Sequence, residues 1–214
     1  TSSPLRQGVY GEITRFDVDL FDFLEEQDFR RSPVSITVSD FKHFADRMLR
    51  TLDAVHAAGW VHNDVKPENV GVLMRSGRNR LDTAMLIDFG HAKRIGSPQE
   101  AHGTPSYFPP ECKAGCLLPP GYDPRAKDAF AVGVTMLVAW YVVRHYDETP
   151  WFFKAGSSAE FHAGRSDRMV RLNEHKFQDA PQRLESELLR LVDPDWTKRP
   201  SLAETRAAIH GITV

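Results

Sequence analysis

The segment richest in chemically capable side chains lies between residues 61 and 69, which read Val-His-Asn-Asp-Val-Lys-Pro-Glu-Asn. It places a carboxylate at Asp64, an ammonium at Lys66 and an amide at Asn69 close together in the chain. A second carboxylate, Asp88, follows in the run Leu-Ile-Asp-Phe-Gly. Carboxylate and amide oxygens are hard ligands that suit Mg²⁺, and phosphoryl transfer is catalysed mostly by positioning and charge neutralisation. The residue types therefore predict magnesium-assisted phosphoryl transfer.

In this order and at this separation, the two segments resemble the catalytic loop H-R-D-L-x-x-x-N and the metal-binding motif D-F-G of the eukaryotic protein kinases. The resemblance implies that Asp64 is the catalytic base, which accepts or orients the proton of a substrate hydroxyl. It also implies that Lys66 places a cation near the transferring phosphate. Asn69 and Asp88 would bind the metal ion that accompanies ATP.

Three neighbouring residues are expected to support the site. Phe89 would pack into the core and set the pose of Asp88, and Gly90 would permit the backbone turn that follows. His62 lies on an apolar flank, so we interpret it as a packed core histidine and not as a ligand.

The resemblance continues downstream. Residues 103–111 read Gly-Thr-Pro-Ser-Tyr-Phe-Pro-Pro-Glu and are similar to the G-T-x-x-Y-x-x-P-E that ends a kinase activation segment. Thr104 is expected to be a structural hydroxyl near the catalytic loop. Asp128 opens a run similar to D-x-W-x-x-G and is implied to anchor the catalytic loop, although alone it would read as a helix N-cap. Arg199, in a late Arg-Pro motif, is implied to pair with Glu111.

The small lobe of a kinase has no counterpart in the sequence. Neither G-x-G-x-x-G nor V-A-I-K precedes the catalytic loop, although a complete kinase needs both. Residues 12–24 resemble the hinge strand and first helix of the large lobe, with the hinge near 12–18, so that backbone groups of Thr14 and Phe16 would face the adenine. We interpret residues 1–214 as a protein kinase C-terminal lobe without its N-terminal lobe, either a fragment of a longer protein or a degenerate kinase.

Two departures from the pattern of the family bear on function. Asn63 replaces the arginine that, in the family, binds a phosphorylated activation segment. Activity is therefore expected not to depend on phosphorylation of Ser97 or Thr104. Gly71 stands where a leucine normally lies under the adenine, which would remove apolar contact and weaken the nucleotide site.

A finer resemblance concerns residues 108–111 and 128–140. They are similar to the secreted rhoptry and dense-granule kinases of apicomplexan parasites, some of which lack the Gly-rich loop and some of which are pseudokinases. This likeness would place the protein in the secretory pathway or the parasitophorous vacuole; without it, a cytoplasmic location is expected.

Composition and periodicity fit one mainly α-helical domain. The chain has 214 residues, 41% of them hydrophobic and 26% charged, with a net charge of −2, which predicts no nucleic-acid footprint and no disorder. Apolar periodicity predicts helices at 39–59, 183–192 and 202–209. Short β-type runs are expected at 70–74 and 84–87, around a hairpin-like turn at 76–80. The apolar run 129–143 is too short to span a membrane and is predicted to be a buried helix.

Cys112 and Cys116 are expected to be free, partly buried thiols. The predicted fold is thus a kinase-like large lobe with a short hinge strand and small β-hairpins at the catalytic loop.

Together, these features are interpreted as a Ser/Thr protein kinase lobe with ATP and Mg²⁺ as cofactors. Lys66 together with Thr104 resembles Ser/Thr kinases and not tyrosine kinases. The partners would be a protein substrate and its own N-terminal lobe, and the chain alone is expected to be inactive. The alternative is a pseudokinase that acts as a scaffold or binding module, which Asn63, Gly71 and the missing small-lobe motifs favour and the intact catalytic residues oppose.

Overall fold

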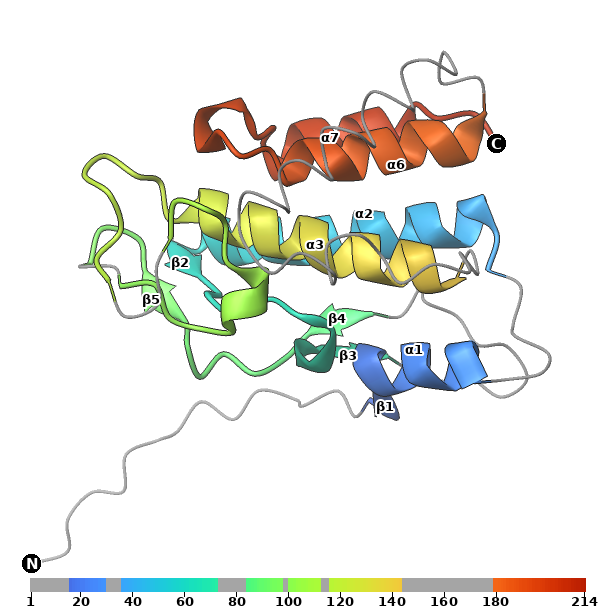
Figure 1. The fold of residues 1–214 in the computed structure, drawn as a ribbon, viewed down its shortest axis with the longest axis horizontal. Coiled ribbons are helices and arrows are strands. Elements are labelled where there is room, and N and C mark those ends of the chain that lie inside the picture. The colour runs from blue at the N-terminus through green and yellow to red at the C-terminus, as the bar shows by residue number, and fades with distance from the viewer. Residues whose placement is uncertain (1–15, 30–35, 73–83, 98–99, 113–115, 144–178) are drawn as a thin grey trace, which may run out of the picture.

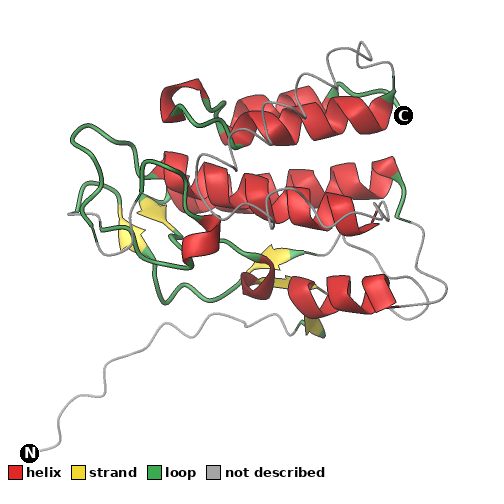
Figure 2. Cartoon of the chain, viewed as in Figure 1, coloured by secondary structure: helices red, strands yellow, loops and turns green. Residues whose placement is uncertain are grey.

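Stacked helices with small strand pairs beside them make up the fold (Figures 1 and 2). The structure is a computed structural model and describes residues 16–29, 36–72, 84–97, 100–112, 116–143 and 179–214. Helices α6 (Ala180–Leu191) and α7 (Leu202–His210) form the upper layer in Figure 1, above α2 (Val38–Ala57) and α3 (Arg125–Val143). Helix α1 (Leu20–Phe29) lies below them, next to the strands.

Helix α3 forms the centre of the core. All of its residues except Arg125, Ala126 and Val142 are buried, because other elements pack around it. It is the one helix of the described residues that is long and apolar enough to cross a membrane, yet 89% of its most apolar stretch is buried inside the molecule. The buried helix predicted at 129–143 is therefore confirmed. The expectation that it is too short to span a membrane was wrong as regards length, because the helix begins at Arg125 and has 19 residues.

Helix α2 shows how local sequence fixes an element. Thr37 and Asp40 form a capping box, in which each side chain accepts the backbone N–H of the other residue, and this satisfies donors that the first turn leaves unpaired. One face of the helix is buried, and the Phe41 ring meets the Trp140 ring of α3 edge-on, with the centroids 4.8 Å apart. This packing fixes α2, and with it the loop that follows its last turn.

Two small antiparallel sheets carry the segments of interest. In one, β3 (Val70–Val72) pairs with both β1 (Val18–Asp19) and β4 (Met85–Leu86). In the other, β2 (Trp60–Val61) pairs with β5 (Lys93–Arg94). Short 3-10 turns at Pro67–Asn69, Pro105–Tyr107 and Trp196–Lys198 complete the described elements.

Most elements predicted from periodicity are present at slightly different bounds. The helices α2, α6 and α7 and the strands β3 and β4 all appear where periodicity placed them. The hairpin-like turn at 76–80 lies outside the described residues, as does most of the expected hinge, including Thr14. Both cysteines are free, but Cys112 is buried and Cys116 is exposed, so the prediction of two partly buried thiols was wrong for Cys116.

Candidate active site

The catalytic loop runs from the end of β2 to the start of β3 and is fixed at both ends. The antiparallel pairing of Val70 with Leu86 brings the residue before β3 beside the residue after β4. Accordingly, the Ile87 N–H donates to the Asn69 carbonyl at 3.0 Å. Asn69 and Asp88, which are separated in sequence, therefore emerge from the same end of one strand pair.

The Asp64 carboxylate is the centre of a polar network. Its Oδ1 accepts from the Thr104 backbone N–H at 2.8 Å and from the Thr104 hydroxyl at 2.9 Å. Its Oδ2 accepts from Asn69 Nδ2 at 3.0 Å and lies 3.2 Å from Lys66 Nζ, which itself donates to the Thr104 hydroxyl at 2.8 Å. The four residues thus meet as the sequence predicted, and Thr104 contacts both Asp64 and Lys66.

The environment sets the charge of Asp64. Burial raises the pKa of its carboxyl, but the hydrogen bonds from Thr104 and Lys66 and the lysine charge together outweigh burial and hold the pKa below its ordinary value. Asp64 is therefore an ionised carboxylate with a fixed orientation at neutral pH. It can orient a hydroxyl and accept its proton.

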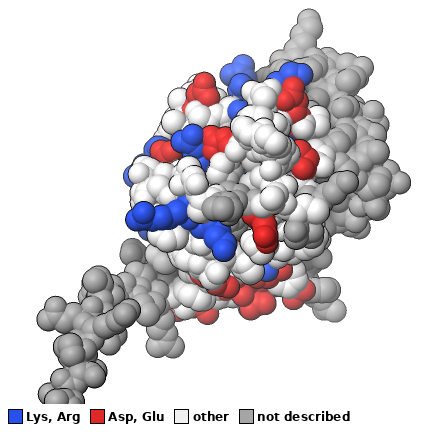
Figure 3. Space-filling model, turned by 90° about the vertical axis from the view of Figure 1, so that its left-hand side faces the viewer, with Lys and Arg blue, Asp and Glu red and all other residues white. Residues whose placement is uncertain are grey.

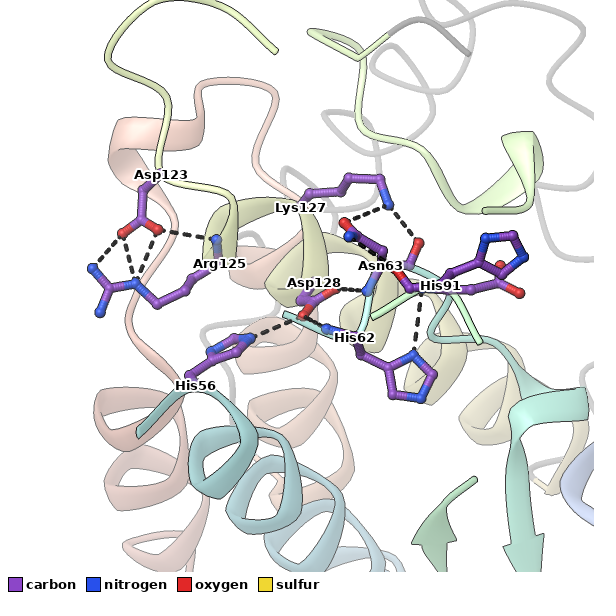
Figure 4. Close-up of polar contacts among 9 residues, drawn as sticks. His56, His62, Asn63, His91, Asp123, Arg125, Lys127 and Asp128 are labelled. Atoms are coloured by element: carbon purple, nitrogen blue, oxygen red, sulfur yellow. Dashed lines mark hydrogen bonds and ion pairs between the residues drawn. The ribbon is translucent and has the colours of Figure 1, made fainter. Parts of the chain in front are cut away.

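Hydrogen bonds of His62 and Asp128 fix the backbone of the loop (Figure 4). His62 is fully buried; its Nε2 donates to the Ile87 carbonyl at 3.1 Å and its Nδ1 accepts from the Asp64 N–H at 3.4 Å. Burial lowers the pKa of His62, which favours this neutral form. Asp128 accepts the backbone N–H groups of His62 and Asn63 at 2.7 and 2.8 Å. The structure thus contains His62 as a packed core histidine. Asp128 anchors the loop and is not a simple N-cap.

His56 belongs to this network and was not singled out from the sequence. Its Nε2 lies 2.9 Å from Asp128 Oδ2, and Asp128 itself is fully buried. Burial raises the pKa of Asp128, but hydrogen bonds and charge from His56 lead the effects that bring the pKa below its ordinary value. In the sequence, His56 matched only the apolar periodicity of its helix, so nothing pointed to this contact.

Asp88 and Asn69 supply the oxygens that a metal ion would need. Asp88 is exposed, has a left-handed backbone (φ 56°) and accepts the Gly90 N–H at 3.1 Å. The Nδ2 of Asn69 is engaged with Asp64, which leaves its amide oxygen directed elsewhere. One carboxylate and one amide oxygen at the end of one strand pair fit a divalent ion whose remaining ligands are phosphates and water. The described residues contain no cluster of three His, Cys, Asp or Glu side chains.

Phe89 differs from the prediction that it packs into the core. It is 48% exposed, although one side of its ring lies 4.8 Å from the His62 ring, centroid to centroid. It also borders an apolar hollow of about 420 Å³, which is lined by Val55, Ala58, Trp60, Phe89 and Ala92. The described residues cover only one side of the ring, which is why it stays exposed.

Gly71 lies directly against the ring of Phe16. The expectation that glycine at this position weakens the nucleotide site stays a prediction. A Cβ atom added at Gly71 would come within 2.7 Å of Phe16 Cγ. Phe16 therefore occupies the space that a larger side chain at this position would need.

Lys127 is the second residue that the sequence analysis missed. Its side chain is buried, and Nζ donates to the carbonyl of Asn63 at 2.5 Å (Figure 4). Nζ also donates to the carbonyl of His102 at 2.7 Å. Burial lowers the pKa of Lys127, and the charge of the adjacent Asp128 opposes this. The available signal was a lysine beside Asp128 at the start of an apolar run, which reads equally well as a solvated charge.

Glu111 and Arg199 form the ion pair that the resemblance implied. The guanidinium binds both carboxylate oxygens, with Nη1–Oε1 at 2.7 Å and Nη2–Oε2 at 2.9 Å. Its Nε also donates to the Asp193 carbonyl at 2.8 Å, and the Tyr122 hydroxyl donates to Glu111 at 2.8 Å. The ion pair therefore links the segment that contains Glu111 to the segment that contains Arg199, just before α7.

Charges on the end of the molecule that carries β2 and β5 are mixed. Figure 3 shows basic and acidic side chains distributed over this face in small groups. The near-balanced net charge of −2 agrees with that distribution.

Comparison with known proteins identifies the family. The sequence profile described as protein kinase domain matches residues 13–209, so this chain belongs to the protein kinase domain family. Proteins of this class use ATP and a divalent metal ion and act on protein substrates.

Curated relatives are consistent with this assignment. The chain is 31% identical over 148 residues to myosin light chain kinase A of Dictyostelium discoideum, which covers 67% of this chain and 45% of that protein. It is 47% identical over 92 residues to serine/threonine-protein kinase PkaB of Streptomyces coelicolor, which covers 40% of this chain and 21% of that protein. It thus spans less than half the length of these relatives. The comparisons do not support the pseudokinase alternative or the finer resemblance to apicomplexan secreted kinases, and the cellular location stays a prediction.

Proposed function

We propose that this chain is the large lobe of a Ser/Thr protein kinase, which transfers the γ-phosphate of ATP to protein hydroxyls when a small lobe completes the nucleotide cleft. The observation that carries the proposal is the Asp64 carboxylate, held by Thr104 of the activation segment and by Lys66 and Asn69 of the catalytic loop. A group fixed by this many donors is positioned before the substrate arrives, which is the main way in which proteins catalyse this reaction.

The chemistry of the step assigns a role to each side chain. The oxygen of the Ser or Thr hydroxyl forms a bond to the γ-phosphorus, the bond from that phosphorus to the bridging oxygen breaks, and ADP leaves. Asp64 takes the hydroxyl proton. Because its pKa lies below the ordinary value, Asp64 is a weak base that first orients the hydroxyl and accepts the proton late, which suits a loose transition state.

Two more groups complete the site. Lys66 Nζ lies 3.2 Å from Asp64 Oδ2 and supplies a cation beside the reacting group. A bound Mg²⁺ would neutralise charge on the phosphates, and Asp88 with Asn69 are the residues that would hold it. Relatives named as serine/threonine-protein kinases support hydroxyls of Ser and Thr as the acceptors.

The requirement for a small lobe rests on two observations. The sequence carries neither the Gly-rich loop nor the strand lysine that cover the phosphates. In addition, Phe89 and Trp60 are 48% and 39% exposed beside an apolar hollow of about 420 Å³. A nucleotide held from one side only gains little of the burial on which small-molecule affinity depends.

Transfer of labelled phosphate from γ-³²P-ATP to a Ser/Thr peptide library by the full-length protein tests the function. Replacing the metal-binding carboxylate in Asp88→Asn should lower the rate by at least about 100-fold, since several kcal/mol of transition-state stabilisation are lost. Asp22→Asn, which alters an exposed carboxylate on α1, is the matched control and should leave the rate unchanged. Equal activity in Asp88→Asn, or label found only on tyrosine, would contradict the proposal.

Titration calorimetry of the 214-residue chain with Mg-ATP tests the need for a second lobe. We expect no binding at micromolar concentrations, because half of the cleft is missing. A dissociation constant near 1 μM, about −8 kcal/mol, would show that the chain holds the nucleotide by itself.

A further inference from the structure

A buried ammonium joins two segments that are remote in sequence. The side chain of Lys127 leaves the first turn of α3 and is 2% exposed. Its Nζ donates to the carbonyl of Asn63 in the catalytic loop at 2.5 Å and to the carbonyl of His102 at 2.7 Å. Lysine is almost never buried to this degree without partners, so the two carbonyls are what keep this cation inside.

The two segments approach each other very closely at this point. A Cβ atom added at Gly103 would lie 2.3 Å from the Asn63 carbonyl oxygen, and Gly103 has a φ of 110°, which favours glycine. Two carbonyl oxygens, those of Asn63 and His102, therefore converge here. The Lys127 ammonium lies between them and replaces their mutual repulsion by two charge-assisted hydrogen bonds.

Aromatic packing encloses the same cation. Lys127 Nζ lies 4.9 Å from the centroid of the Phe108 ring, and Phe108 belongs to the segment that follows Gly103. The carbonyl of Asn63, the carbonyl of His102 and the Phe108 ring thus surround one ammonium, and two of these three groups come from residues 100–112.

The placement of this segment matters for the catalytic carboxylate. Thr104 directly follows Gly103, and both its N–H and its hydroxyl bind Asp64 Oδ1. Any displacement of His102 would carry Thr104 with it and release one oxygen of Asp64. No hydrogen bond joins Lys127 to Asp64, although their opposite charges attract each other. Lys127 therefore positions Asp64 mainly through the two backbone segments whose carbonyls it binds.

We propose that Lys127 is a positioning residue that holds the activation segment against the catalytic loop without a phosphate group. The proposal rests on the proposed function, since it concerns the same site. Asn63 stands where the kinase family carries an arginine that binds a phosphorylated activation segment, and an amide cannot replace that cation. Lys127 supplies a donor that belongs to the fold itself, through its hydrogen bonds to the Asn63 and His102 carbonyls, so the site is assembled as soon as the chain folds.

Hydrogen exchange of the backbone amides measures directly how firmly Lys127 holds the activation segment against the catalytic loop. In Lys127→Met, which keeps the length of the side chain but removes the donor, the amides of residues 101–104 should exchange at least about tenfold faster, because each lost charged hydrogen bond weakens the contact. Amides of α6 should keep their protection. Lys127→Arg, which retains donors, should restore part of the protection, and Lys198→Met, whose side chain is 70% exposed, is the control that should change nothing.

Steady-state kinetics of the full-length protein measure the effect of Lys127 on the rate of phosphate transfer. For Lys127→Met we expect kcat to fall at least about tenfold while KM for ATP changes less than about threefold, since only the orientation of Asp64 is affected. Phosphatase treatment of the wild-type protein should leave both kcat and the exchange of the Thr104 amide unchanged. This last measurement needs no variant and therefore holds even if Lys127→Met does not fold.

Three results would overturn the proposal. They are unchanged protection of residues 101–104 in Lys127→Met, an equal loss of protection in every helix, and a loss of Thr104 protection after phosphatase treatment of the wild type. The last result would show that a phosphate holds the segment. If the wild-type protein transfers no phosphate but the exchange results are as expected, the proposed function fails and the role of Lys127 in holding the segment stands.

Discussion

The ion pair between Arg199 and Glu111 should be among the largest single contributions to stability in this fold. The Arg199 side chain is 1% exposed and that of Glu111 is 14% exposed. The guanidinium makes two hydrogen bonds to Glu111 and further ones to the carbonyls of Asp193 and Ala126. Arg199→Met removes all of these donors and leaves a largely buried carboxylate without its cation.

Breaking a buried pair in this way costs about 3–5 kcal/mol of unfolding free energy. For a domain of this size that loss lowers Tm by roughly 6–20 °C. Urea unfolding followed by circular dichroism gives the free energy. The double variant Glu111→Gln, Arg199→Met should recover part of the loss, because the stranded charge is then gone.

An exposed pair of the same chemistry provides the control. Arg125 and Asp123 have side chains that are 54% and 37% exposed. Arg125→Met should therefore cost no more than about 1 kcal/mol. A loss below about 1 kcal/mol in Arg199→Met, or equal losses in both variants, would refute the reasoning that burial makes the Arg199 pair important.

Three further predictions concern single positions in the site. Gly103→Ala would place a Cβ atom 2.3 Å from the Asn63 carbonyl oxygen; we expect faster hydrogen exchange in residues 101–104 and a lower Tm, and an unchanged Tm would contradict the close approach. Gly71→Leu should lower Tm because its Cβ would lie 2.7 Å from Phe16 Cγ, and adding Phe16→Ala should restore stability; failure of the double variant to recover would argue against this contact. Burial lowers the pKa of His62, so the stability that it contributes is present above its unfolded pKa of about 6.5 and is lost as pH falls toward the folded value. Unfolding free energy should accordingly decrease from about pH 7.5 to about pH 5.5, and it should decrease less steeply in His62→Gln.

Local patterns in the sequence were sufficient for the helices and for the catalytic quartet. The bounds of α2 followed from apolar spacing, because that helix buries one continuous face. Asp64, Lys66 and Asn69 lie in one short loop, so few conformations could separate them. The pairing of β3 with β4 brings Asp88 and Asn69 to the same end of one strand pair, and their role as metal ligands stays a prediction.

Contacts between remote segments could not be predicted in the same way. Lys127 and His56 reach the catalytic loop and Asp128 only after α2 and α3 have packed, and a charged or polar residue near a helix end normally indicates solvent. Phe16 fills the space beside Gly71 through the pairing of β1 with β3, which no local pattern shows. The exposure of Phe89 depends on which groups cover it and not on its own motif.

The rate of phosphate transfer by Asp64→Asn is the most direct test of the central claim that Asp64 is the catalytic base. The variant preserves the shape of the side chain and can still accept hydrogen bonds from Thr104, but it cannot take a proton. At saturating ATP, the full-length variant should be at least about 100-fold slower than the wild type in phosphorylating a Ser/Thr peptide. Its Tm should stay within a few degrees of the wild-type value, as judged by thermal unfolding. Wild-type turnover in Asp64→Asn would contradict the account, because the carboxylate on which the whole network converges would then have no part in the reaction.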